Sequence, residues 1–278
     1  MNTYAAIDVR TDSPDLLLAI VDDFGPTAVE ERSPSVRVFF STTGDRDEAQ
    51  RALAPRFEVT AVDVPDDDWA RRSQENLAPV TVGRITVFPN PQSAIRNPQS
   101  IRDPHSATRN TIDIVIVPSM GFGTGHHVTT RLCLTALQTI DLAGRTVLDV
   151  GTGSGVLAIA ADRLGAASAI GIDYDADAIQ SARESLAFNP EARRVTFETI
   201  ELGARALPVA DVVTANLTGA LLARSAETLL AAVSPGGTLI LSGIQSHERD
   251  EVRQAFAAAE VMWERDEDGW AGLAVKKP

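Results

Sequence analysis

The segment over residues 147–173 constrains the fold of this 278-residue chain most, because it reads as strand, glycine turn, helix and strand in succession. Its turn is Gly151-Thr152-Gly153-Ser154-Gly155, and an apolar run follows it. Glycines at a strand-to-helix turn let a ligand approach the backbone, because no Cβ intervenes. The pattern predicts the ligand-binding βαβ unit of a doubly wound parallel sheet.

Two acidic residues discriminate between the cofactors that such a turn binds. Asp149 precedes the first glycine, where it either caps the strand end or neutralises the amino group of a methionine moiety. Asp173 ends the next strand, where it can accept hydrogen bonds from both ribose hydroxyls of an adenosine. The turn lacks the third glycine of the dinucleotide pattern, since position 156 is Val. We therefore predict an S-adenosylmethionine site and exclude a dehydrogenase.

Strand and helix patterns alternate from residue 111 onwards, which is typical of a parallel sheet with helices on both faces. The strands are predicted at 147–150, 168–173, 195–200, 211–216 and 237–242. The helices are predicted at 128–139, 155–164, 175–188, 218–232 and 246–259. Two further strands, at 261–265 and 269–276, flank an acidic turn and predict a β-hairpin. The predicted fold is the Rossmann-like α/β fold of class I methyltransferases with a C-terminal β-hairpin.

The first 64 residues read as β-α-β-β-α-β, the pattern of a small ferredoxin-like α+β domain. Strands are predicted at 3–10, 28–32, 36–41 and 57–64, and helices at 14–24, with Ser13 as N-cap, and at 45–54. Residues 65–110 form a connector that contains a short strand over 80–88 and a low-complexity insertion over 89–110. The insertion is either a flexible recognition arm or a tolerated surface insertion. Residues 111–278 then form the cofactor-binding domain.

Composition narrows the setting in which the protein works. The apolar share of 44% suits a globular protein, and no run approaches the ~20 apolar residues of a membrane-spanning helix. The amino terminus has no signal-peptide pattern, so we expect a cytoplasmic protein, and we expect a monomer. A net charge of −13 argues against nucleic-acid binding and suits either a basic partner or solubility alone.

The spacing of the cysteine and the histidines in the sequence does not indicate a metal site or a disulfide. Cys133, the one cysteine, lies among leucines and is predicted to be a buried structural thiol. His126 and His127 are adjacent and have no third ligand at a suitable spacing, so we predict no metal.

Four stretches share the pattern of one known family. They are the loop over 118–130 with its Phe122-Gly123-Thr124-Gly125 core, the glycine turn with its two acids, Ala215-Asn216-Leu217, and residues 68–70 together with 79–85. Through these stretches the whole chain resembles the PrmA family, class I methyltransferases of large-subunit ribosomal protein eleven. The resemblance implies that residues 1–64 recognise the substrate.

The resemblance also implies roles for individual residues. The Phe122 loop would fold over the methionine end of the cofactor and exclude water. Asn216, at the end of the fourth strand, would hold the substrate amine in line with the methyl group. The alternative is that Asn216 has a structural role in the turn. His127 would order the loop and is a minor candidate for a base. The implied cofactor-binding residues are Phe122, Gly123, Thr124, Gly125, Thr130, Asp149, Gly151, Gly153, Gly155, Asp173 and Asn216.

The chain departs from the family pattern on the substrate side. The departures are Val117, His126, Val128 and the pair Thr218-Gly219. The leading hypothesis is an N-methyltransferase that acts on lysine ε-amines or α-amines of a basic ribosomal protein by positioning and desolvation. One alternative keeps the fold and methylates another protein lysine or a small amine. A second is a non-catalytic cofactor-binding module.

Overall fold

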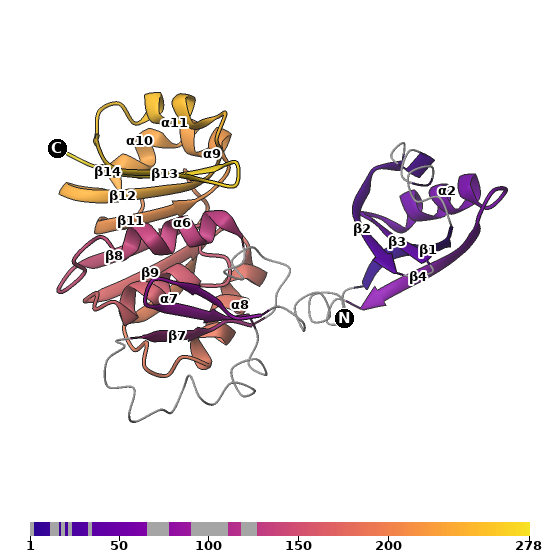
Figure 1. The fold of residues 1–278 in the computed structure, drawn as a ribbon, viewed down its shortest axis with the longest axis horizontal. Coiled ribbons are helices and arrows are strands. Elements are labelled where there is room, and N and C mark those ends of the chain that lie inside the picture. Colours follow the sequence, from indigo (N-terminus) through magenta and orange to yellow (C-terminus); the bar gives the residue numbers. More distant parts are fainter. Residues whose placement is uncertain are drawn as a thin grey trace. The chain divides into compact units, whose positions relative to one another are not determined.

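The structure, a computed structural model, describes residues 3–11, 17, 20–21, 24–32, 35–65, 78–89, 111–117 and 127–278. It divides the chain into two compact units, Met1–Ser73 and Gln74–Pro278 (Figure 1). Most of the helix predicted over 14–24, the insertion over 90–110 and the loop over 118–126 lie outside the described residues. No helix among the described residues is long and apolar enough to span a membrane.

The first unit has the predicted ferredoxin-like sheet. Its strands are β1 (Thr3–Arg10), β2 (Pro26–Arg32), β3 (Ser35–Phe40) and β4 (Glu58–Pro65), and its described helix is α2 (Thr43–Leu53). The strands lie in the order β2-β3-β1-β4, and every neighbouring pair is antiparallel. Alternate residues such as Ile7 and Val38 are buried in one cluster with Leu53 of α2, which fixes the face that the helix covers.

The second unit is built on the predicted doubly wound sheet. Its strands lie in the order β10-β9-β8-β11-β12-β14-β13. Their bounds are β8 (Thr146–Val150), β9 (Ser168–Asp173), β10 (Val195–Thr199), β11 (Ala210–Asn216), β12 (Val233–Gln245), β13 (Glu260–Glu267) and β14 (Trp270–Lys276). The first five strands in this order are parallel, and β14 and β13 form the predicted hairpin around Asp268-Gly269, both at positive φ. The strand order reverses between β8 and β11, where doubly wound sheets bind ligands.

Helices cover both faces of this sheet. The helices α6 (Val128–Leu137), α7 (Val156–Arg163) and α8 (Ala176–Ala187) share one apolar cluster, which includes the buried Cys133. The helices α9 (Gly219–Arg224), α10 (Ala226–Ala231) and α11 (Arg249–Ala255) share the cluster on the opposite face. The prediction of one helix over 218–232 is wrong, because Ser225, at φ −103° and ψ 9°, ends α9 and begins α10. Cys133 is buried, as predicted, and burial raises the pKa of its thiol.

A small three-stranded sheet also belongs to the second unit. It contains β5 (Val80–Val82), β6 (Ile85–Phe88) and β7 (Ile112–Val115), with β6 antiparallel to β5 and parallel to β7. The prediction of one strand over 80–88 is therefore wrong. The chain turns at Gly83, whose φ is +58° and whose missing Cβ leaves room for the Gln138 amide of the segment after α6.

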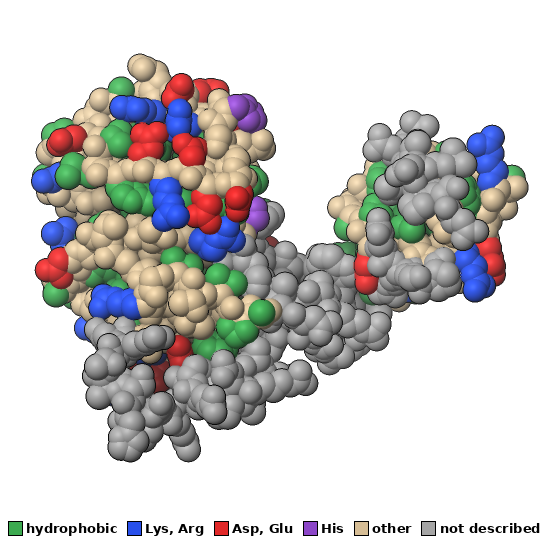
Figure 2. Space-filling view, in the orientation of Figure 1, with side chains coloured by type: hydrophobic (Ala, Val, Ile, Leu, Met, Phe, Trp, Pro, Cys, Tyr) green, Lys and Arg blue, Asp and Glu red, His purple; other side chains and the backbone are tan. Residues whose placement is uncertain are grey.

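Charged side chains are mixed on the surface of this unit. Figure 2 shows basic and acidic side chains interspersed on the visible face. Arg249 pairs with Asp266 at 2.6 Å, and Arg131 pairs with Glu267 at 2.7 Å. Both pairs join helices to β13, the edge strand, and charged side chains on an edge strand oppose aggregation.

Replacement of Gly243 by Ala is expected to destabilise the protein more than replacement of Gly236 by Ala. Both glycines lie in β12 at positive φ, +84° and +72°, so both substitutions strain the backbone by about 1–2 kcal/mol. At Gly243 the added Cβ would also lie 2.2 Å from the carbonyl oxygen of Leu217, whereas at Gly236 it meets nothing within 4 Å. Overpacking adds about 1–3 kcal/mol. Equal losses in free energy of unfolding, measured with urea, would contradict the close approach.

Candidate cofactor and acceptor site

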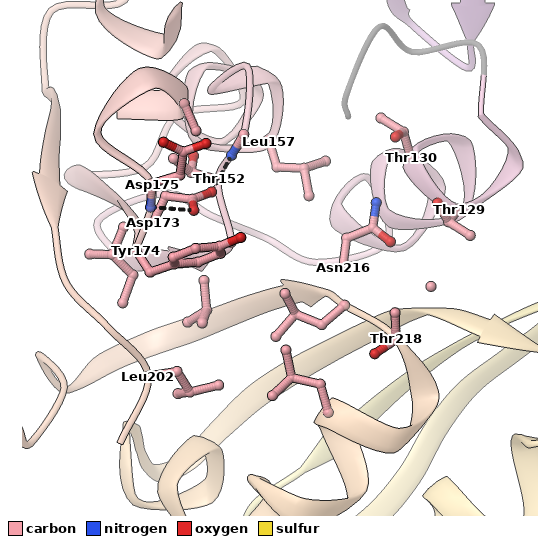
Figure 3. A pocket seen from close by; sticks show the side chains of 18 of the residues that line it. Thr129, Thr130, Thr152, Leu157, Asp173, Tyr174, Asp175, Leu202, Asn216 and Thr218 are labelled. Atoms are coloured by element: carbon pink, nitrogen blue, oxygen red, sulfur yellow. Dashed lines mark hydrogen bonds between the residues drawn. The ribbon is translucent and has the colours of Figure 1, made fainter. Parts of the chain in front are cut away.

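A cavity of about 410 Å³ opens at the carboxyl ends of β8, β9 and β11, where the strand order reverses. Its lining combines the glycine turn, the end of β9, the residues after β11 and the start of α6 (Figure 3). Two carboxylates, Asp173 and Asp175, line it, and among the described residues no Lys or Arg does. This charge pattern disfavours a pyrophosphate and suits a cofactor that carries a sulfonium and an amino group.

The glycine turn forms one part of the cavity wall. Gly151 and Thr152 donate their backbone N–H groups to the carbonyl oxygen of Ile172, both at 2.9 Å, so the turn is joined to β9. Gly151 and Gly153 line the cavity, as the sequence predicts. Gly155 is not among the residues that line it. A Cβ at Gly155 would lie 2.7 Å from the ring of Phe197, so this glycine serves close packing of the turn against β10.

Asp173 lies at the end of β9 on the cavity wall. One carboxylate oxygen accepts the N–H of Gly153 at 3.0 Å, and the other accepts the N–H of Asp175 at 3.2 Å. These bonds fix the orientation of the carboxylate and leave lone pairs for further donors, as two ribose hydroxyls require. Asp175 in turn caps α8 by accepting the N–H of Asp177 at 2.9 Å.

Asp149 lies behind the glycine turn and does not line the cavity. Its side chain is 1% exposed, and its two oxygens accept the hydroxyls of Thr152 and Thr214, each at 2.6 Å. Burial raises the pKa of this carboxyl to about 6, although both hydroxyl donors lower it. Asp149 therefore joins the turn to β11, and the predicted direct pairing with an amino group stays a prediction.

Asn216 is the last residue of β11 and lines the opposite side of the cavity from Asp173 (Figure 3). Within the part of the chain that the structure describes, no hydrogen bond occupies its side-chain amide. Thr218, two residues later, also lines the cavity, and its hydroxyl does not cap α9. The structure thus presents polar groups with free hydrogen-bonding capacity at this end of the cavity.

His127 caps α6 and lines the cavity together with Thr130. Its Nδ1 lies 2.7 Å from the Thr129 hydroxyl and accepts the Thr129 N–H at 3.4 Å. Its ring meets the edge of Trp270 at 4.8 Å between centroids. Burial, with Arg131 nearby, lowers the pKa of His127. Nδ1 is thus engaged with Thr129, and the minor role of His127 as a base stays a prediction.

Four predicted residues, Phe122, Gly123, Thr124 and Gly125, lie outside the described residues, as does His126. The sequence interpretation did not identify the apolar part of the lining, which includes Tyr174, Leu202, Leu221 and Trp270. Tyr174 directly follows Asp173, the acid that ends β9, and this position in the sequence could have identified it as a lining residue.

Comparisons with known proteins indicate the family to which the chain is similar. A family model described as ribosomal protein L11 methyltransferase (PrmA) matches residues 24–278. The chain is 35% identical to the ribosomal protein L11 methyltransferase of Deinococcus radiodurans over 270 residues, which cover 94% of this chain and 92% of the relative. It is 36% identical to the Geobacter metallireducens protein of the same name, with 86% and 80% covered. A crystal structure of ribosomal protein L11 methylase from Lactobacillus delbrueckii subsp. bulgaricus is similar, with a TM-score of 0.61, 26% identity, and 73% of this chain and 99% of that chain covered.

Replacement of Asp149 by Asn is expected to change how stability depends on pH. Because the pKa is raised from 3.8 to about 6, the native state holds a proton in this window that the unfolded state has released. Stability from this group is therefore lost as pH rises from 3.8 to about 6. At roughly 1.4 kcal/mol per pKa unit, the loss is about 2–3 kcal/mol.

The Asn variant lacks this ionisation. Urea unfolding of both proteins at about pH 4 and at about pH 7 checks the expectation, since other groups cancel in the comparison. The free energy of unfolding of Asp149→Asn, relative to the original protein, should be higher at the upper pH. The same relative value at both pH values would show that the carboxyl is not perturbed.

Proposed function

We propose that this chain, which belongs to the PrmA family of S-adenosylmethionine-dependent methyltransferases, transfers methyl groups to amines of ribosomal protein L11. The observation that carries the proposal is the Asn216 amide, which lines the same cavity as the Asp173 carboxylate and makes no hydrogen bond to the described residues. The wall with Asp173 then suits an adenosine, and the wall with Asn216 suits an amine. The names of the relatives supply the acceptor protein.

The residues on the Asp173 side would hold the cofactor. Asp173 would accept hydrogen bonds from the ribose hydroxyls, and Gly151 and Gly153 would allow the cofactor to approach the backbone. Thr130, at the first turn of α6, would lie near the methionine end together with the loop that carries Phe122. The bound cofactor supplies a methyl group on a positively charged sulfur, which is already activated for displacement by an amine.

The residues on the Asn216 side would prepare the acceptor. A lysine amine has a reference pKa of about 10.4, so it must lose a proton before its lone pair can attack. The apolar neighbours Leu217, Leu221 and Trp270 disfavour a charged ammonium, and the proton leaves to water. The carbonyl oxygen of Asn216 accepts an N–H of the neutral amine and so orients its lone pair, which is a positioning role.

The domain organisation follows the same proposal. Residues 1–64 would recognise the protein substrate, residues 65–110 would form the connector with its insertion, and residues 111–278 would carry out the chemistry. The strands β5 and β6, inside the connector, are part of the second unit, so the connecting segment proper is shorter than 65–110. We propose that the enzyme acts as a cytoplasmic monomer.

The purified chain incubated with ribosomal protein L11 and tritiated S-adenosylmethionine tests the proposal. We expect label on L11, and mass spectrometry of its peptides would identify lysine or α-amine sites. Measurable binding of S-adenosylhomocysteine without transfer to L11 would contradict the assigned substrate. Label on a different protein or on a small amine would support the same fold with another acceptor.

Asn216→Leu is expected to lower kcat by about 100-fold, because a misplaced acceptor commonly costs that much. Asn216→Asp keeps an accepting oxygen at the same place and is the matched control. We expect it to retain more activity than the Leu variant. Initial rates with L11 at saturating S-adenosylmethionine measure the difference. Equal rates for the two variants would show that the carbonyl oxygen does not position the amine.

A further inference from the structure

Thr218 lies two residues after Asn216 on a segment whose backbone stays extended. The N–H of Leu217, the residue between them, donates to the carbonyl oxygen of Ser242 at 3.0 Å, so the pairing with β12 continues past the end of β11. Thr218 itself has φ −63° and ψ 147°. Side chains two residues apart on an extended chain lie on the same side, with their Cα atoms about 6.6 Å apart. Both side chains line the cavity, and Figure 3 shows them at the same end of it.

The hydroxyl of Thr218 has no hydrogen-bond partner within the part of the chain that the structure describes. Thr218 is the N-cap residue of α9, and a threonine at this position commonly accepts a backbone N–H of the first helical turn. Here the side chain makes no such bond. Thr218 is also exposed, so a protein substrate that enters the cavity can reach it. The hydroxyl is therefore available to a ligand.

Accepting oxygens are few at this end of the cavity. Asn216 offers its carbonyl oxygen and Thr218 its hydroxyl, whereas Leu221, which follows Thr218 on α9, is apolar. The indole of Trp270 has a donor and no acceptor. Thr130 lies on α6, and the proposed function places it at the methionine end of the cofactor. An amine held by Asn216 thus finds one further accepting oxygen close by, that of Thr218.

The number of accepting oxygens matters because each methyl transfer consumes an N–H. In each transfer an N–C bond forms, the C–S bond breaks with its electron pair going to the sulfur, and the amine gives a proton to water. With its lone pair in line with the methyl group, a neutral primary amine carries two N–H groups, a monomethylated amine one, and a dimethylated amine none. A methylated amine therefore presents a methyl group where an N–H was, and an oxygen that faces it loses its hydrogen bond.

We propose that the Thr218 hydroxyl is a specificity-determining group that favours the first methyl transfer to an amine over the second. The inference rests on the proposed function, in which the carbonyl oxygen of Asn216 accepts one N–H of the acceptor. Thr218 accepts the other N–H of a primary amine. When the amine carries one methyl group, one of the two oxygens faces that group, so the second transfer proceeds with one hydrogen bond fewer.

Thr218→Val tests the proposal, because it replaces the hydroxyl with a methyl group and nearly keeps the shape of the side chain. The original protein and the variant act on unmethylated ribosomal protein L11 at saturating S-adenosylmethionine. Mass spectrometry of L11 peptides follows the unmethylated, monomethylated and dimethylated forms of each amine with time. We expect the ratio of the second to the first rate constant to rise roughly threefold to tenfold in Thr218→Val, the range for one hydrogen bond.

Two further variants separate the hydroxyl from the shape of the side chain. Thr218→Ser keeps the hydroxyl and is the matched control, for which we expect the ratio of the original protein. Thr218→Ala lacks the hydroxyl and introduces no new contact, so its ratio should rise in the same direction as that of Thr218→Val. Isothermal titration with S-adenosylhomocysteine checks that each variant is folded and holds the cofactor.

Other results would overturn the inference and leave L11 as the substrate. A ratio that is unchanged or lower in Thr218→Val and Thr218→Ala would do so, and so would an equal rise in Thr218→Ser. A fall of both rate constants by the same factor would assign Thr218 a general role in amine binding and no role in specificity. Absence of methyl transfer to L11 by the original protein would overturn the proposed function and this inference together.

Discussion

One buried carboxylate holds together the part of the sheet on which the site depends. Asp149 accepts the Thr152 hydroxyl from the glycine turn and the Thr214 hydroxyl from β11. Asp149 lies on β8 and therefore joins this strand to β11 and to the glycine turn that follows β8. The strand order of the sheet reverses between β8 and β11. A carboxyl in this place costs stability, as its raised pKa shows.

The geometry of the cavity follows from this junction. Gly151, held against β9, comes close to Leu217, since a Cβ there would lie 2.5 Å from that side chain. Gly243 comes close to the backbone of Leu217. Leu217 thus lies close to two glycines, and Asn216 directly precedes it in the chain. The Asn216 amide makes no hydrogen bond to the described residues, so they leave it available for an acceptor.

The sequence predicted the elements that local pattern determines. The strands and helices around the glycine turn, the C-terminal hairpin and the ferredoxin-like sheet are of this kind, because their periodicity and turn residues agree. The sequence-based prediction was wrong where a contact with a residue far away in the sequence determines the local structure. The turn at Gly83 depends on Gln138, which donates to the Val82 carbonyl oxygen and accepts the Arg84 N–H, each at 2.9 Å. The sequence also did not indicate the contact between Asp149 and Thr214, 65 residues later.

The same limit explains why the sequence did not indicate the contacts that Ser185 and Asn189 make with β7. In sequence they are polar positions in a predicted helix and directly after it, and such positions usually face solvent. Their burial is explained by β7, because their side chains accept the backbone N–H groups on the edge of this strand that faces away from β6. Gln138 binds the β5–β6 turn in a similar way, so side-chain amides that follow the ends of α6 and α8 hold the small sheet at both of its sides. A strand pairs with helices in this manner only where further strands are absent. The small sheet therefore takes its position from α6 and α8, the two helices whose first turns also line the cofactor cavity.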